Sequence, residues 1–129
     1  MAKTAKRAKG DIGEEVAAKY LTNKGYLVIE HNYWKPWGEI DIVVERKNTL
    51  CFVEVKTVSR EARAENPIKI RPEKKFHLAK LKRLHRAIQT YLLEHKVPEN
   101  KPWEIILACV YLDFSTHRAK VELFENLIL

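Results

Sequence analysis

Cysteine is scarce in this sequence. Its 129 residues include only Cys51 and Cys109, and each lies inside an apolar run typical of a strand. Two such cysteines do not support a disulfide framework or a cysteine-based zinc site. We therefore expect two buried thiols in a protein of a reducing compartment.

Long hydrophobic runs are also absent. No apolar stretch approaches the roughly 18–20 residues that a membrane-spanning helix needs. The basic residues 1–9 lead into no hydrophobic segment of the kind found in a secretory signal. These absences predict a cytoplasmic protein with no membrane partner. We expect residues 1–9 to form a flexible basic tail and residues 10–129 to form one domain.

Acidic residues are outnumbered by basic ones. The sequence has 17 Asp and Glu against 24 Lys and Arg, which gives a formal net charge of +7. This excess favours an acidic partner, with nucleic acid ahead of a membrane surface. An acidic protein is an alternative partner, because net charge narrows the partner class without identifying it.

The most informative stretch is residues 38–57. Two β-branched apolar runs, 40–44 and 50–55, flank the polar residues 46–49. This pattern predicts two antiparallel strands joined by a tight turn. If the turn holds Lys47 and Asn48, residues whose numbers sum to 95 face each other.

That register brings charged residues together. Asp41 then faces Glu54, Glu39 faces Lys56, and side-chain alternation sends all four to one side of the sheet. The other side would carry an apolar set that packs against a helix: Ile40, Ile42, Val44, Cys51, Val53 and Val55.

Opposed carboxylates repel each other, and a divalent cation between them removes the repulsion. Carboxylate oxygens, completed by a backbone carbonyl and waters, suit Mg²⁺, with Mn²⁺ as a substitute. A lysine two residues after the second carboxylate would lie beside the metal, where it orients a water or stabilises phosphate charge. The alternative interpretation is a solvated sheet face on which Lys56 forms surface ion pairs with Glu54 and Glu39.

Asp41, twelve intervening residues and then Glu54-Val55-Lys56 resemble the PD-(D/E)XK nuclease superfamily. More narrowly, five ordered motifs resemble the bacterial YraN family of predicted endonucleases, which are related in fold to archaeal Holliday junction resolvases. The motifs are Gly10-x-x-Gly13-Glu14, Gly25-Tyr26, Asn32-Tyr33, Gly38-Glu39-Ile40-Asp41 and Phe52-Val53-Glu54-Val55-Lys56. They cover nearly the whole chain, with Ile40 in place of the proline of the superfamily motif.

The resemblance implies roles for these residues. Asp41, Glu54 and the Val55 backbone carbonyl would hold Mg²⁺, Glu14 would act through a bound water, and Glu39 would assist less directly. Lys56 would position the attacking water. The residues alone leave a second interpretation open for Glu14, because it follows Asp11 at the spacing of a capping box.

The rest of the pattern predicts an α/β fold. We expect a first helix from Gly10-Asp11 to Gly25, a strand at 26–33, a helix at 73–95 and strands at 103–114 and 119–124. Residues 58–72 would form a loop beside the site. The order is α-β-β-β-α-β-β, with a parallel crossover around the second helix. The resemblance implies a restriction-endonuclease-like three-layer sandwich with a mixed five-stranded sheet.

Basic residues concentrate in residues 69–86, which contain eight Lys or Arg and one acid. A solvated helix face does not need such one-sided charge, which favours contacts with phosphate. Residues 34–38 add two tryptophans and a lysine, which either stack on bases or seal the sheet edge. The candidate nucleic-acid contacts are Lys75, Lys82, Arg83, Arg86, Gln89, Trp34 and Lys35.

These features predict a Mg²⁺-dependent endonuclease that hydrolyses DNA phosphodiester bonds, and the resemblance implies branched or junction DNA as the substrate. The alternative function is a non-catalytic DNA-binding module on a nuclease-like fold. Junction resolvases cut symmetrically, which raises a homodimer as an assembly, although the residues identify no two-fold interface.

Overall fold

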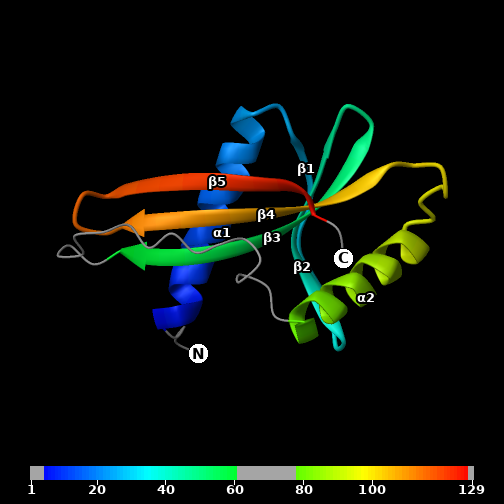
Figure 1. Cartoon of the computed structure of the whole chain (residues 1–129), viewed down its shortest axis with the longest axis horizontal. Coiled ribbons are helices and arrows are strands. Elements are labelled where there is room, and N and C mark those ends of the chain that lie inside the picture. The colour runs from blue at the N-terminus through cyan, green and yellow to red at the C-terminus, as the bar shows by residue number, and fades with distance from the viewer. Residues whose placement is uncertain (1–4, 61–77, 128–129) are drawn as a thin grey trace.

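A computed structural model describes residues 5–60 and 78–127, and its element order is the predicted α-β-β-β-α-β-β (Figure 1). The elements are α1 (Ala5–Asn23), β1 (Leu27–Lys35), β2 (Gly38–Arg46), β3 (Thr49–Arg60), α2 (Leu78–Glu94), β4 (Trp103–Asp113) and β5 (Arg118–Leu127).

The strands form one mixed sheet in the order β1-β2-β3-β4-β5. Strand β3 pairs with β4 in parallel, with α2 in the connection between them, and the other neighbouring pairs are antiparallel. The five-stranded mixed sheet predicted from the sequence is confirmed.

The two helices cover opposite faces of this sheet, which gives three layers. Side chains alternate between the faces of a strand, and alternate residues of β2 and β3 belong to two separate cores. The core under α1 includes Ala17, Leu21, Ile42, Val44, Cys51, Val53 and Ala108. The core under α2 includes Val43, Leu50, Phe52, Leu84, Ile88, Tyr91 and Ile105.

The turn between β2 and β3 has the predicted register. Arg46 pairs with Thr49, and the ladder runs back to the pair Ile42 and Val53. Lys47 and Asn48 have φ angles of 50° and 65°, as a two-residue type I′ turn requires. The backbone twist of such a turn matches the right-handed twist of the two strands. The turn therefore fixes which residues of β2 and β3 face each other.

The β2–β3 ladder ends at Ile42 and Val53, and beyond this point the sheet forks. Strand β2 continues beside β1 back to Gly38, whereas β3 continues beside β4 to Arg60. In Figure 1, β1 and β2 turn away from the direction of β3, β4 and β5. The fork creates a site where β2 side chains rather than β2 backbone face β3.

The fork corrects two predictions. The pairs Asp41–Glu54 and Glu39–Lys56 are not rungs of the ladder, which stops one residue earlier. Ile40 belongs to the core under α2 and not to the core that contains Ile42. Strict alternation fails here because the start of β2 leaves β3 and lies against α2.

The predicted start of the first helix was also wrong. Helix α1 begins at Ala5, so residues 5–9 of the expected tail are helical and Asp11 lies inside the helix instead of capping it. Its predicted end is confirmed. Gly25 has a φ of 94°, and the Tyr26 N–H donates to the Leu21 carbonyl at 3.0 Å, which is a Schellman cap.

Other boundaries differ by smaller amounts. Strand β3 runs to Arg60 and includes the first residues of the predicted loop, while residues 61–77 of that loop and helix lie outside the described residues. Cys51 and Cys109 are both buried, and no disulfide joins them. None of the described helices is long and apolar enough to cross a membrane.

Two glycines let the helices approach the sheet closely. A Cβ added at Gly13 of α1 would lie 1.8 Å from Thr57 Oγ1 of β3, and one at Gly38 of β2 would lie 2.2 Å from the Arg83 carbonyl oxygen of α2. Real Cβ atoms do not approach other atoms so closely. Each helix is therefore held at the sheet by a position that only glycine fits.

We expect Gly13→Ala to lower the free energy of unfolding by about 1–3 kcal/mol, because the added methyl overpacks the contact with Thr57. Gly10→Ala is a matched control in the same helix, since nothing lies within 4 Å of its added Cβ. It should raise stability by roughly 0.4–1 kcal/mol through the unfolded chain. Urea unfolding measures both, and equal effects would contradict the close approach.

Candidate functional site

Asp41 and Glu54 lie at the fork. They are the only buried charged residues among the side chains that the structure describes, with 8% and 4% of their surface exposed. The Val55 N–H donates to Asp41 Oδ2 at 2.7 Å. Because the β2–β3 ladder has ended, a carboxylate of β2 accepts this amide hydrogen in place of a backbone carbonyl.

Lys80 of α2 forms an ion pair with Glu54 Oε1. Lys80 is not among the site residues predicted from the sequence, although the sequence carries a signal for it. Lys80 precedes Leu84 and Ile88 at intervals of four, and both of these leucine and isoleucine side chains are buried. A lysine on the buried stripe of a helix indicates a partner inside the protein.

Glu14 of α1 approaches Asp41 from the face of the sheet opposite to α2. It is half-buried, and its carboxyl group lies close enough to that of Asp41 for the two charges to repel each other. Burial, followed by repulsion from Asp41, Asp11 and Glu39, raises the pKa of Glu14 to about 7. Helix α1 therefore presents Glu14 to the fork, and the capping-box interpretation is wrong.

The cluster has more negative than positive charge. Burial and the neighbouring Asp41 raise the pKa of Glu54 to about 8, although Lys80 opposes the shift. Burial also raises the pKa of Asp41, against the opposing effect of the Val55 N–H. Burial disfavours the charged form of Lys80, but Glu54 and Asp41 outweigh it and raise its pKa. The carboxyl groups therefore favour a proton or an additional cation.

Lys56 follows Glu54 on β3 and is exposed. Within the described residues it forms no ion pair with Glu54 or Glu39, so the interpretation of these residues as surface ion pairs is wrong. Glu54 is buried and its partner is Lys80. Glu39 is exposed and close enough to the fork to raise the pKa of Glu14.

The donor set at the fork fits a hard divalent cation, because it consists of carboxylate oxygens. Residues 5–60 and 78–127 contain no three Asp, Glu, His or Cys side chains already arranged around one metal position. The Lys80 ammonium contacts a Glu54 oxygen that such a cation would need. Metal binding at this site would therefore require a change in side-chain positions.

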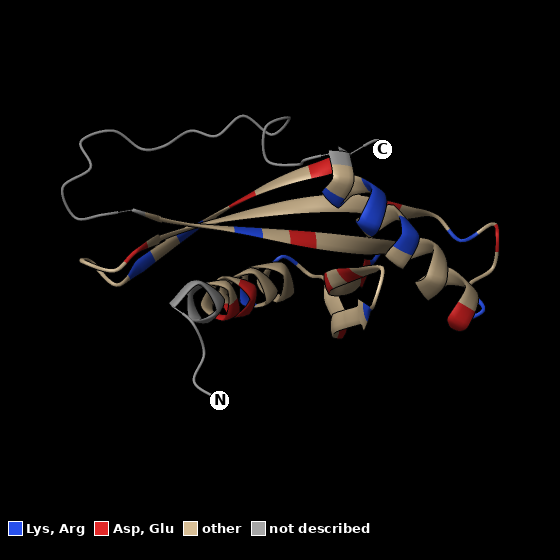
Figure 2. Ribbon diagram, turned by 90° about the horizontal axis from the view of Figure 1, so that it is seen from below, with Lys and Arg blue, Asp and Glu red and all other residues tan. Residues whose placement is uncertain are grey.

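Helix α2 carries most of the candidate nucleic-acid contacts on its exposed side. Lys82, Arg83, Arg86 and Gln89 are exposed, and Glu94 is the only acid of the helix (Figure 2). Lys75 lies outside the described residues. The predicted buried stripe through Leu84, Ile88 and Tyr91 is confirmed.

Trp34, near the end of β1, and Trp37, in the β1–β2 connection, have different environments. Trp37 Nε1 donates to Thr90 Oγ1 of α2 at 3.0 Å, so Trp37 fastens the connection to the helix. Trp34 is 65% exposed and available for stacking. Lys35 forms an ion pair with Glu94 at 2.5 Å.

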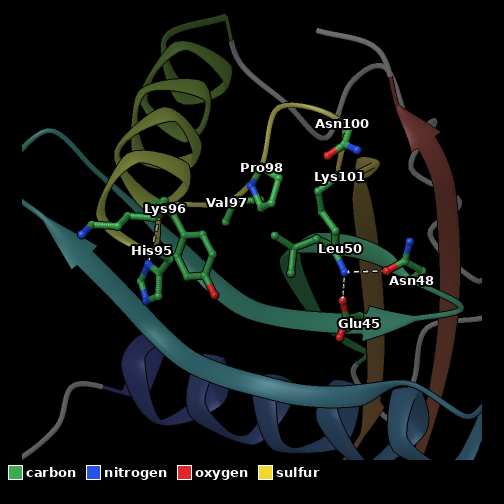
Figure 3. Close-up of a pocket in the computed structure, with 10 residues that line it drawn as sticks. Glu45, Asn48, Leu50, His95, Lys96, Val97, Pro98, Asn100 and Lys101 are labelled. Carbon is green, nitrogen blue, oxygen red and sulfur yellow. Dashed lines mark hydrogen bonds and ion pairs between the residues drawn. The ribbon is translucent and has the colours of Figure 1, made fainter.

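A separate cavity of about 510 Å³ lies between the β2–β3 turn and the C-terminal end of α2 (Figure 3). Lys101 lines it and contacts Glu45 and, at 2.9 Å, Asn48 Oδ1. None of the carboxyl groups at the fork lines this cavity. Glu45 and Asn48 already engage Lys101, and the cavity lies away from the carboxyl cluster, so it is not the candidate site.

The raised pKa values predict the pH dependence of stability without metal. Glu14 and Glu54 have ordinary values of 4.5 and folded-state values of about 7 and about 8. Between these limits the folded protein keeps protons that the unfolded chain has released. The free energy of unfolding should therefore fall as pH rises from about 5 to 8, by up to about 1.4 kcal/mol per pH unit for each proton.

Thermal unfolding in EDTA at pH 5 to 8 measures this effect, and Glu54→Gln should flatten the profile because the amide does not titrate. A wild-type stability that rises over this interval would contradict the assigned shifts.

Comparison with other sequences identifies the relatives of this chain. Residues 13–115 match the uncharacterised protein family UPF0102. A UPF0102 protein of Alkaliphilus oremlandii is 33% identical over 117 residues, which cover 91% of this chain and 94% of the relative. One from Dehalococcoides mccartyi is 33% identical over 121 residues, covering 94% and 93%. One from Wolinella succinogenes is 38% identical over 91 residues, covering 70% and 76%. The chain therefore belongs to the UPF0102 (YraN) family.

Proposed function

We propose that this protein is a Mg²⁺-dependent endonuclease that hydrolyses DNA phosphodiester bonds. The observation that supports it best is the convergence of Asp41, Glu54 and Glu14 from three different elements on a fork with excess negative charge. Burying like charges is costly in a fold. A site that does so is better explained by a cation-dependent reaction than by stability.

Asp41 and Glu54, with the Val55 backbone carbonyl, would hold Mg²⁺, and Mn²⁺ would substitute for it. Glu14 would take part through a bound water, and Glu39 would add negative charge from the exposed rim. When bound, such a metal acts as a Lewis acid on a phosphate and lowers the pKa of a bound water. The Val55 N–H donates to Asp41 Oδ2, and this hydrogen bond would orient the carboxylate for such a role.

Lys56 supplies the other half of the chemistry. It is exposed, it follows Glu54 by two residues, and it forms no ion pair with the fork carboxylates in the described structure. Its ammonium can therefore orient the attacking water and offset the negative charge that develops on the phosphate. A lysine neutralised by a surface ion pair would be less able to do so.

The exposed side of α2 provides the surface for the DNA backbone. Lys80 fixes the first turns of α2 at the fork, and Lys82, Arg83 and Arg86 continue along the helix from there. Cationic side chains beside the carboxyl cluster would hold a phosphate backbone near the site of hydrolysis. Branched or junction DNA as the substrate, and a homodimer as the assembly, are parts of the same proposal that come from the family resemblance.

The first test is cleavage of labelled duplex, flap, single-stranded and four-way-junction DNA with Mg²⁺ or Mn²⁺. We expect Glu54→Gln and Lys56→Ala each to lower the cleavage rate by about a hundredfold or more, because each removes a group that acts on the developing charge. DNA binding should persist in both variants.

Lys24→Ala is the control for Lys56→Ala, because Lys24 is an exposed lysine in the turn that follows α1. Wild-type cleavage by Lys56→Ala would remove this residue from the mechanism. If wild type binds every DNA in a salt-dependent way and cleaves none, the protein is instead the non-catalytic binding module.

A second test concerns the exposed basic side of α2, formed by Lys82, Arg83 and Arg86. We expect Arg86→Ala to weaken DNA binding and to reduce the slope of log affinity against log salt by about 1, as for the loss of one phosphate contact. Fluorescence anisotropy at several salt concentrations measures this slope. If the slope for Arg86→Ala equals that for the reference variant Lys24→Ala, the proposed contact between Arg86 and a DNA phosphate is excluded.

A further inference from the structure

Lys80 has no place in the motifs that define the candidate site, yet it contacts one of the two buried carboxylates. Its ammonium pairs with Glu54 Oε1, and Glu54 has 6% of its side chain exposed. Lys80 itself is 38% exposed, so its chain reaches in from the surface of α2. The Lys80 side chain can therefore move away from Glu54 into solvent.

The backbone of α2 holds Lys80 in place. Arg83, three residues further on, presses its carbonyl oxygen against Gly38 at the start of β2, where a Cβ would lie 2.2 Å away. Lys80 and Arg83 are about one helical turn apart in α2. The glycine contact therefore places the Lys80 side chain over the fork instead of leaving it among the exposed basic residues.

The positive charge of Lys80 partly neutralises the carboxylates at the fork, as a bound metal ion would. Three acids, Asp41, Glu54 and Glu39, all favour the charged form of Lys80 despite its partial burial. One positive charge does not balance these carboxylates together with Glu14, and a divalent cation would balance them better. A lysine and a divalent cation sharing Glu54 would repel each other.

We propose that Lys80 is an internal counter-ion which holds the Glu54 carboxylate in the absence of metal and competes with a divalent cation for it. This inference rests on the proposed function, since it concerns the same carboxylates. It makes Lys80 a positioning residue: it keeps Glu54 ordered at the fork, and metal binding displaces it. The affinity of the site for metal is then weaker than its carboxylates alone would give.

The experiment is a Mn²⁺ titration of the full chain, without DNA, in which electron paramagnetic resonance reports the free ion. Lys80→Met removes the charge and the donor, whereas Lys80→Gln removes the charge and keeps a donor for Glu54. Each should bind Mn²⁺ about tenfold more tightly than wild type, as for the loss of a competing interaction of ordinary strength. Lys80→Arg should stay near wild type because it keeps the charge.

Lys82→Met is the matched control, since Lys82 is an exposed lysine of the same helix two residues away. It tests whether a general loss of positive charge explains the gain. Damage to the fold would weaken Mn²⁺ binding, so tighter binding by Lys80→Met or Lys80→Gln cannot come from misfolding. Thermal unfolding in EDTA should show lower stability for Lys80→Met, and saturating Mn²⁺ should restore it.

The outcomes separate this inference from the proposed function. If wild type binds Mn²⁺ and both neutral Lys80 variants bind it equally or less tightly, the inference is overturned and the metal site stands. If Lys82→Met gains as much affinity, the effect is one of net charge and the inference is also overturned. If no variant binds Mn²⁺, both the inference and the metal-dependent function fail.

Discussion

Asp41 and Glu54 repel each other at the point where β2 and β3 separate, and both are buried there. Their neighbours are arranged to offset this repulsion. The Val55 amide donates to one carboxylate, Lys80 pairs with the other, and raised pKa values favour protons on the acids. A fold that needed only stability would place apolar side chains at such a position. The fork is therefore the part of the structure where stability and the proposed chemistry conflict.

The helices owe their positions to two close contacts with the sheet. Gly13 brings α1 against Thr57, next to Lys56, and thereby presents Glu14 to Asp41. Gly38 brings α2 against β2 and thereby presents Lys80 to Glu54. Gly13 and Gly38 each precede a glutamate in the sequence, and both have a packing role. The charged site therefore depends on two uncharged packing contacts between helix and sheet.

Helix α2 joins the core and the candidate DNA surface. Its buried stripe, with Leu84, Ile88 and Tyr91, packs on β1 and β2, while Lys82 and Arg86 point away from that core. The same rotation of the helix that buries the stripe sets Lys80 over the fork. A shift of α2 along the sheet would therefore change the metal site and the basic face together.

Local patterns determined much of this structure. The strand runs, the turn at Lys47-Asn48 with its register, and the end of α1 at Gly25 follow from residues close together in the chain, because turn geometry and side-chain alternation act over a few residues. The same register sets Asp41 and Glu54 one residue beyond the last pair of the ladder, Ile42 and Val53, and the fork leaves their side chains near each other. Tertiary packing decided the rest. Ile40 packs in the core under α2, contrary to strict alternation, because the start of β2 lies against that helix. Glu54 pairs with Lys80 and not with Lys56 because α2 packs closely on Gly38. Gly38 and its contact Arg83 are 45 residues apart, and rules that act over a few residues do not predict such a contact.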